Sequence, residues 1–299
     1  MSITFVGMRD RSSGIVRGLQ LVDCDPNNNF LDKNTGYLYG KNKDISKNII
    51  FVRSYDKRIA SHFKSRGHTI GFDIIDRPVA ELHKLQRSDN NLKSIDWSLF
   101  CHEEIDYYIV TNSLAKKELS KVTKKSIYVI PHHTVSKNIV KKNNNELKVL
   151  GYVGIEDQLN CRDEIIEYCN KRNLTFYENH PKDSAQCIED LKKVDIGIIF
   201  LEKNNRTDYV LKYKPNQKLS NFQCFGIPTV CVKYESYQEF SSPGSCIFID
   251  KKEDMFDAID KIIADSNLRE NIIKNGYISA DKLLVKNVIK LYNKIKELE

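Results

Sequence analysis

Three absences from this 299-residue sequence each exclude a class of protein. The longest apolar stretches, such as Ile196–Leu201, fall far short of the roughly 18 residues that a membrane-spanning helix needs. No basic-then-apolar leader opens the chain, because Met1–Gly7 runs directly into a strand-like segment. The eight cysteines form no CxxC pair, which argues against a disulfide framework and a zinc site. We expect a soluble cytoplasmic protein without a transmembrane segment, whose membrane contacts, if any, are peripheral.

The charge balance is basic but modest. Lys and Arg total 47 against 40 acidic residues, so 47 − 40 gives a net charge of +7, and 40% of the residues are apolar. That apolar share can bury substantial cores, and a length of 299 residues fits one large or two ordinary domains at about 100–200 residues each. The positive charge suits an anionic small substrate, anionic lipid headgroups or nucleic acid, and does not choose among them.

Short apolar segments alternate with helix-like segments along the whole chain, which predicts βαβ units and parallel sheets. The polar tract Lys141–Glu146 interrupts the alternation and is interpreted as a linker. We therefore predict two doubly wound α/β halves, with the ligand beyond the carboxyl ends of the strands. Near the C-terminus, Leu284, Val288, Leu291, Ile295 and Leu298 form one apolar stripe at helical spacing, which must pack on another part of the chain.

Two segments could bind an anion. The loop Gly7–Gly18 leads from the first strand into the first helix, and Gly14 and Arg17 could approach a phosphate there. Its spacing matches neither GxGxxG nor GxxxxGK[ST], and an ordinary tight turn with solvated arginines is the alternative. In the second segment, Lys214 and Lys218 lie near a predicted helix start, where they could hold a diphosphate; a surface helix with solvated lysines is the alternative.

The second segment also carries a family resemblance. Its residues follow the pattern K-P-x-x-K-L, a small-residue helix, G-x-P-x-V, then Tyr and Glu. The matching residues are Lys214, Pro215, Lys218, Leu219, Gly226, Pro228, Val230, Tyr237 and Glu239. Further motifs occur in order at residues 17–20, 109–113, 130–132 and 151–154, so the resemblance spans nearly the whole chain. The sequence resembles GT-B glycosyltransferases of the family 4-like group.

The resemblance implies a fold and an activity. Two Rossmann-like domains would face each other across a cleft, with an acceptor-binding domain at residues 1–142 and a nucleotide-sugar-binding domain at 143–280. Residues 281–299 would form a helix that packs back on the first domain. The activity would be transfer of a sugar from a nucleotide-diphosphate donor to a hydroxyl of a glycan, lipid-linked or other acceptor, with retention and without a metal or other cofactor.

The same resemblance assigns candidate residues. Donor-binding candidates are Gly14, Arg17, Arg206, Lys214, Asn216, Lys218, Asn221 and Tyr237, and catalytic candidates are Asp76, His102 and Glu239. Two departures weaken the match: Asn221 stands where many family members have a ribose-binding Glu, and the Arg expected after Gly154 is absent, so that Arg206 would replace its charge.

Several alternatives stay open at this point. Asp76 could instead cap a helix before Arg77-Pro78. The sequence Asp23-Cys24-Asp25 has the DxD form of metal-binding enzymes, but we interpret it as a helix end before Pro26. No G-x-S-x-G elbow supports a serine nucleophile. Two other functions remain: a glycosyltransferase acting on a modified base in DNA, and an inactive nucleotide-sugar-binding or scaffold protein.

Overall fold

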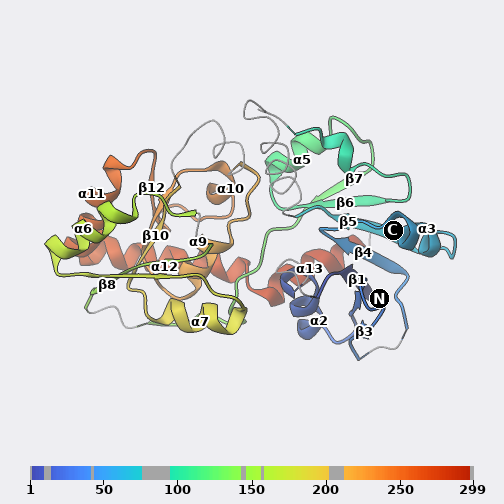
Figure 1. Cartoon of the computed structure of the whole chain (residues 1–299), viewed down its shortest axis with the longest axis horizontal. Coiled ribbons are helices and arrows are strands. Elements are labelled where there is room, and N and C mark those ends of the chain that lie inside the picture. Colours follow the sequence, from blue (N-terminus) through green and yellow to red (C-terminus); the bar gives the residue numbers. More distant parts are fainter. Residues whose placement is uncertain are drawn as a thin grey trace. The chain divides into compact units, whose positions relative to one another are not determined.

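The computed structural model describes residues 2–9, 15–41, 44–75, 95–142, 146–155, 158–201 and 212–296. The chain divides into two compact units (Figure 1). Unit 1 comprises Met1–His132, Tyr209–Pro215 and Val285–Glu299, and unit 2 comprises His133–Asp208 and Asn216–Leu284. The chain thus crosses between the units more than once, and the segment around Lys214 belongs to unit 1 while Lys218 belongs to unit 2.

Unit 1 is built on a seven-stranded sheet with the order β3-β2-β1-β4-β5-β6-β7. Its strands are β1 (Ile3–Gly7), β2 (Asn29–Asp32), β3 (Leu38–Tyr39), β4 (Asn48–Val52), β5 (Thr69–Asp73), β6 (Tyr107–Val110) and β7 (Ser126–Val129). All neighbouring pairs are parallel except β2 and β3. The strand order reverses between β1 and β4, and ligands of doubly wound folds bind outside the carboxyl ends at such a switch point.

Helices and buried side chains cover both faces of this sheet. The helical segments of unit 1 are η1 (Ile15–Leu19), α2 (Gln20–Cys24), α3 (Lys57–Lys64), η2 (Trp97–Phe100), α5 (Ser113–Leu119) and α13 (Val285–Lys296). The α13 side chains Val285, Val288, Ile289, Tyr292 and Ile295 are buried in one core cluster with β1 and β4 residues. The predicted C-terminal stripe therefore packs on the first unit, as the resemblance implied.

Unit 2 contains a five-stranded parallel sheet with the order β12-β11-β10-β8-β9. Its strands are β8 (Val149–Val153), β9 (Thr175–Asn179), β10 (Ile196–Ile199), β11 (Thr229–Val232) and β12 (Ile247–Ile249). Its helices are α6 (Arg162–Arg172), α7 (Ser184–Lys192), α9 (Gln217–Cys224), α10 (Glu235–Gln238), α11 (Glu253–Ala264) and α12 (Ser266–Lys282). The switch point of this sheet lies between β8 and β10.

Local signals in the sequence explain several element boundaries. Helix α9 ends at Cys224 and is closed by Gly226, which has a φ of 63°. The amide of Ile227 donates to the carbonyl of Phe222 at 3.0 Å, which is a Schellman closure. Helix α2 ends at Cys24 with Asp25 as its C-cap, so the interpretation of the DxD sequence as a helix end is confirmed. The predicted class, two parallel α/β sheets, is also confirmed, although β2 and the antiparallel β3 were not predicted.

Candidate functional site

The carboxyl end of β8 in unit 2 has the geometry of a ligand site. Gly154 follows this strand at the switch point, and helix α9 begins after β10, the neighbouring strand. A Cβ atom placed on Gly154 would lie 2.6 Å from Cε and 2.8 Å from Nζ of Lys218. The Lys218 side chain therefore lies directly against the backbone of the strand end. This is where an open α/β sheet binds its ligand.

Lys218 is held here by two neutral groups. Its ammonium donates to Oη of Tyr152 and to Oε1 of Gln158, the latter at 3.0 Å. The Tyr152 side chain is buried, which raises the pKa of its hydroxyl, and that hydroxyl donates to the carbonyl of Ile155 at 2.7 Å. The phenol therefore stays neutral at physiological pH. A fixed, positively charged ammonium at a strand end can bind an anionic group.

The other predicted residues of helix α9 are close to Lys218 in the chain but differ in their surroundings. Asn216 is the N-cap of the helix, is buried, and its side chain makes no capping hydrogen bond. Asn221 is also buried, and its Oδ1 accepts from the amide of Val135 at 2.8 Å. In the structure, Asn221 therefore holds the 133–142 segment of unit 2, a contact that its position in the helix did not predict.

Lys214 lies in a different unit from Lys218. The preceding residue, Tyr213, is buried in a core cluster of unit 1, where its ring packs edge-on against Trp97 at 5.2 Å. The backbone carbonyl of Lys212 accepts from Nδ2 of Asn112 at 3.3 Å. The sequence motif K-P-x-x-K is therefore divided by a unit boundary, which falls between Pro215 and Asn216.

Tyr237 and Glu239 lie at helix α10 with opposite exposure. Tyr237 is buried, and burial raises the pKa of its hydroxyl well above the ordinary value. Glu239 is exposed and is the C-cap of the helix. Of the two, only the Glu239 side chain is open to solvent.

Arg17 of unit 1 is engaged by protein groups. Its guanidinium is fully buried and donates from Nε to Oδ2 of Asp73 at 2.9 Å. Nη1 and Nη2 donate to the carbonyls of Pro131 and Ile130 at 2.7 and 3.0 Å. Tyr292 of α13 donates to the same Asp73 oxygen at 2.8 Å. The structure thus gives Arg17 contacts that link η1 and β5 to the residues after β7, and the sequence did not predict these partners.

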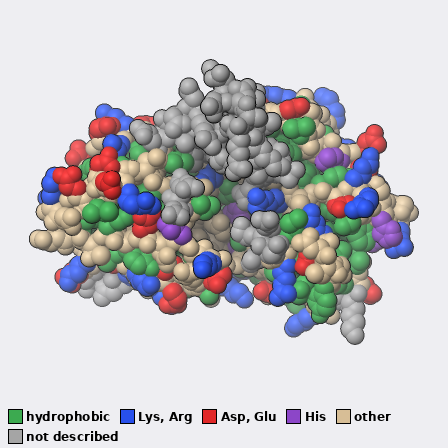
Figure 2. Space-filling model, in the orientation of Figure 1, with side chains coloured by type: hydrophobic (Ala, Val, Ile, Leu, Met, Phe, Trp, Pro, Cys, Tyr) green, Lys and Arg blue, Asp and Glu red, His purple; other side chains and the backbone are tan. Residues whose placement is uncertain are grey.

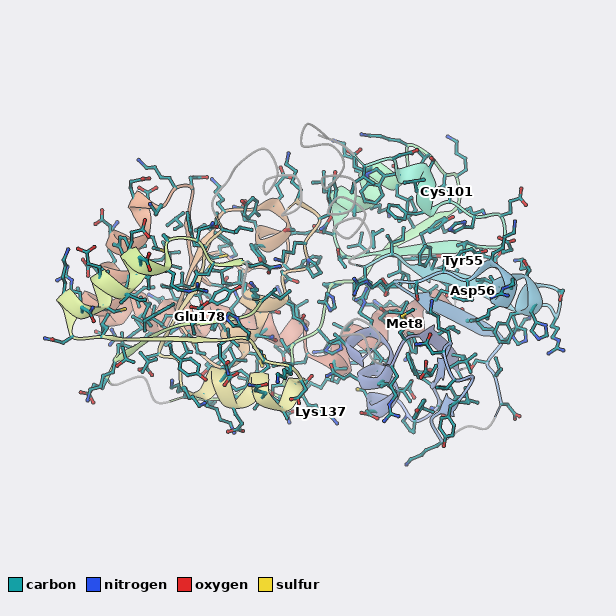
Figure 3. All side chains as sticks on the ribbon, viewed as in Figure 1. Met8, Tyr55, Asp56, Cys101, Lys137 and Glu178 are labelled. Carbon is teal, nitrogen blue, oxygen red and sulfur yellow. The ribbon has the colours of Figure 1, made fainter. Side chains whose placement is uncertain are left out.

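His102 precedes β6 and lies over a face of the unit 1 sheet. Its ring stacks on that of Tyr55 with centroids 4.0 Å apart and planes 9° apart. The Tyr55 hydroxyl donates to Glu104 at 2.5 Å, and this bond is the largest cause that lowers the pKa of Glu104 to about 2 (Figure 3 labels Tyr55). Sequence alone did not predict this cluster, because its members come from separate segments.

Three predicted site residues, Gly14, Asp76 and Arg206, lie outside the described residues. Among the residues that are described, no group of three or more His, Cys, Asp or Glu side chains is placed to hold a metal ion. No helix in the described ranges has the length and apolar character to cross a membrane. All eight cysteines are free thiols. On the face shown in Figure 2, Lys and Arg side chains are interspersed with Asp and Glu.

Two residues that the sequence did not single out occupy strand ends. His180 follows β9, and its Nδ1 lies 2.9 Å from the carbonyl oxygen of Gly154. Arg53 follows β4 at the switch point of unit 1, with a φ of 63° in a three-residue turn closed by a 2.7 Å bond from Ser54 N to Val52 O. For Arg53 the available signal was its position directly after the predicted apolar strand Asn48–Val52.

Solved structures match this chain, whereas sequence comparisons do not. No protein-family model and no curated protein sequence matches the chain. HepE from Anabaena, solved with UDP and glucose, matches with a TM-score of 0.61 and 10% identity over 100% of this chain and 99% of that chain. The pneumococcal O-GlcNAc transferase GtfA, solved with UDP and GlcNAc, matches with a TM-score of 0.55 and 12% identity over 84% of this chain and 56% of that chain.

A third match is TarM from S. aureus, solved with UDP among its ligands, with a TM-score of 0.53 and 13% identity over 84% of this chain and 55% of that chain. The present chain thus spans little more than half the length of GtfA and TarM, and nearly all of HepE. These matches confirm the predicted GT-B-like fold, with its two α/β sheets and a C-terminal helix that packs on the first unit.

Proposed function

We propose that this protein is a glycosyltransferase that transfers a sugar from a nucleotide-diphosphate donor to a hydroxyl acceptor. The observation that carries the proposal is the position of Lys218 against Gly154 and Tyr152, at the switch point of the unit 2 sheet. The GT-B fold supports it, as does the presence of UDP in the solved structures of HepE, GtfA and TarM.

The chemistry of the transfer explains the need for a cation at this place. When the glycosidic bond of the donor breaks, the leaving nucleoside diphosphate gains negative charge. A preorganised positive group that faces this charge lowers the barrier, and such electrostatic stabilisation is usually the largest catalytic contribution. The Lys218 ammonium would supply it, together with the amides in the first turn of α9, which the Asn216 side chain does not cap.

The remaining roles rest on the family resemblance. Unit 1 would bind the acceptor, Asp76 or His102 would orient or deprotonate its hydroxyl, and Glu239 would position the donor sugar. Retention of configuration and independence of a metal are part of the same proposal. The proposal specifies the acceptor only by its hydroxyl group. A glycan and a lipid-linked precursor therefore both fit it.

Isothermal titration calorimetry tests the donor site. Wild-type protein titrated with UDP, GDP and ADP should bind at least one of them, and Lys218→Ala should weaken that binding by about tenfold or more, since a hydrogen bond to a charged group contributes about 1.5–3 kcal/mol. Lys192→Ala is the matched control, because Lys192 is an exposed lysine of unit 2 that pairs with Glu189. Equal affinity of the Lys218→Ala variant and the wild type would remove Lys218 from the site.

Turnover separates the enzyme from a scaffold. Wild-type protein that binds a nucleoside diphosphate should also release it from the corresponding nucleotide sugar, by slow hydrolysis or by transfer. Activity that survives a chelator would support metal independence, and strict dependence on Mn²⁺ or Mg²⁺ would contradict it. Binding without any release of nucleotide would instead favour the non-catalytic alternative.

A further inference from the structure

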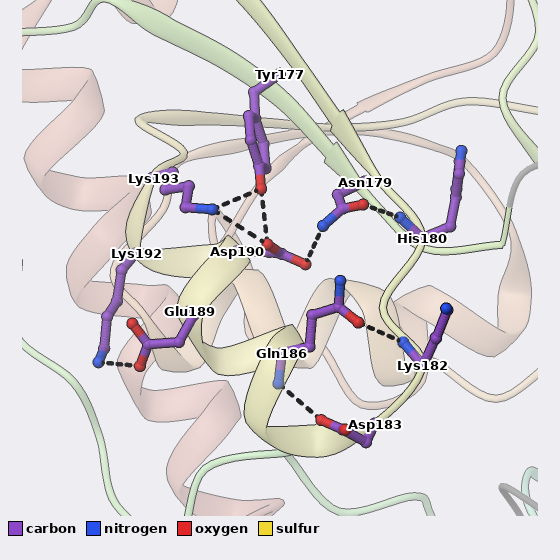
Figure 4. A network of polar contacts seen from close by, with 10 residues as sticks. All are labelled: Tyr177, Asn179, His180, Lys182, Asp183, Gln186, Glu189, Asp190, Lys192 and Lys193. Atoms are coloured by element: carbon purple, nitrogen blue, oxygen red, sulfur yellow. Dashed lines mark hydrogen bonds and ion pairs between the residues drawn. The ribbon is translucent and has the colours of Figure 1, made fainter.

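His180 is held rigidly beside the predicted donor site. Its backbone amide donates to Oδ1 of Asn179 at 2.9 Å, and Nδ2 of Asn179 donates to the buried carboxylate of Asp190 at 2.8 Å (Figure 4). Tyr177 donates to the other oxygen of Asp190 at 2.7 Å. The end of β9 is therefore held by a partly buried network around Asp190, and functional side chains need this kind of support to hold a defined geometry.

The imidazole itself is oriented by the same strand end that contacts Lys218. Its Nδ1 lies 2.9 Å from the carbonyl oxygen of Gly154, and because a carbonyl only accepts, Nδ1 carries a proton. The ring also packs against Tyr152 with centroids 6.4 Å apart. Gly154 therefore has the imidazole of His180 bound to its carbonyl and the ammonium of Lys218 against its Cα.

The second ring nitrogen, Nε2, lies near charged side chains. It lies 3.4 Å from Oε1 of Glu178, which Arg162 binds with two hydrogen bonds of 2.6 Å. Figure 3 labels Glu178 on unit 2. Arg162 offsets the charge of the Glu178 carboxylate toward an approaching anion. The side chain of His180 is 35% exposed, so a ligand can reach it.

We infer that His180 is a second contact for the diphosphate of the donor, with Nε2–H donating to a phosphate oxygen. The inference rests on the proposed function, since it places this contact next to the Lys218 site at Gly154. The diphosphate then lies between two cationic groups, one from α9 and one from the end of β9. The proton on Nε2 comes from solvent when the anion binds. The described side chains near the ring are Glu178, Arg162, Tyr152 and Lys218.

A pair of substitutions separates this role from a merely structural one. The amide nitrogen of Asn can occupy the place of Nδ1, so His180→Asn keeps the bond to Gly154 but removes Nε2. The amide nitrogen of Gln can occupy the place of Nε2, so His180→Gln keeps a donor toward the ligand but loses the bond to Gly154. His68→Asn is the matched control, because Nδ1 of His68 lies 2.9 Å from the carbonyl oxygen of Ser46 in unit 1.

The experiment is calorimetric titration of the wild type and the three variants with UDP, and NMR titration with uridine, which lacks phosphates. We expect His180→Asn to weaken UDP binding about tenfold, His180→Gln to recover most of that loss, and His68→Asn to bind as the wild type does. Uridine binding should not change in any variant. Thermal unfolding of each variant checks that it is folded.

The possible results distinguish the two proposals. If His180→Asn binds UDP as the wild type does while His180→Gln binds weakly, His180 only supports Gly154 and the inference is overturned. Equal loss of UDP and uridine binding would also overturn it, because the effect would not depend on phosphate. If the wild type shows no measurable binding of UDP, GDP or ADP, the proposed function fails, and the inference fails with it.

Discussion

Replacement of Gly154 by alanine tests the geometry of the proposed donor site without removing any polar group. The new Cβ would lie 2.6 Å from Cε of Lys218, 2.8 Å from its Nζ and 2.8 Å from Oη of Tyr152. Real Cβ atoms do not approach other heavy atoms so closely, so both neighbours must give way. The Tyr152 ring is buried and its hydroxyl is bound to the Ile155 carbonyl, whereas the end of a lysine side chain is flexible. We therefore expect the ammonium to be displaced from the strand end.

The expected magnitude follows from this displacement. Loss of one hydrogen bond to a charged group is worth about 1.5–3 kcal/mol, which corresponds to roughly tenfold to 150-fold weaker binding of a nucleoside diphosphate. The free energy of unfolding should fall by about 1 kcal/mol, at the lower end of the range for overpacking, because the flexible lysine end takes up most of the clash and only the buried Tyr152 hydroxyl must shift. Calorimetry with UDP and urea denaturation measure the two quantities on the same protein.

Gly151→Ala is the control with the opposite expectation. Its Cβ would lie 2.2 Å from Cγ2 of Val194, a buried side chain that has no room to move, so overpacking should destabilise the protein by about 1–3 kcal/mol. Nucleotide affinity of the folded protein should stay near that of the wild type. A folded Gly154→Ala variant that binds UDP within twofold of the wild type would refute the reasoning, because the ammonium would then not act from beside Gly154.

Three further predictions concern unit 1. Arg53→Gly should raise the free energy of unfolding by about 1 kcal/mol in urea denaturation, because a φ of 63° strains a residue with a side chain; no gain would argue against that strain. Tyr292→Phe should lower it by about 1–3 kcal/mol, since the buried Asp73 carboxylate loses a donor; a change below about 0.5 kcal/mol would contradict this. Tyr55→Phe should lower it by about 1 kcal/mol at pH 7. Because the folded pKa of Glu104 is lowered from 4.5 to about 2, this bond stabilises the fold above pH 4.5, and the difference should vanish as the pH falls towards 2; a difference independent of pH would contradict the assignment.

The sequence placed some side chains of the candidate site on the correct elements, but it did not show the partners of the polar ones. Lys218 lies at a helix start beside a strand end, as its motif indicated, and the Gly226 closure fixes where that helix stops. Arg17 was predicted as a donor-binding residue from its loop position, and its buried contact with Asp73 was not predicted. The position of an arginine in a glycine-containing loop does not show which carboxylate it will contact.

Most of the helices and strands, and the class of two parallel α/β sheets, were determined by the sequence itself. Hydrophobic periodicity, caps and turn residues act over a few positions, so they can be followed along the chain, as the stripe of α13 shows. The partners of polar side chains were decided only by the tertiary structure. Arg17 and Asp73 are 56 residues apart, Tyr292 is 219 residues from Asp73, and His180 meets Gly154 across 26 residues. Contacts over such separations depend on the order in which strands join a sheet, which local periodicity does not encode.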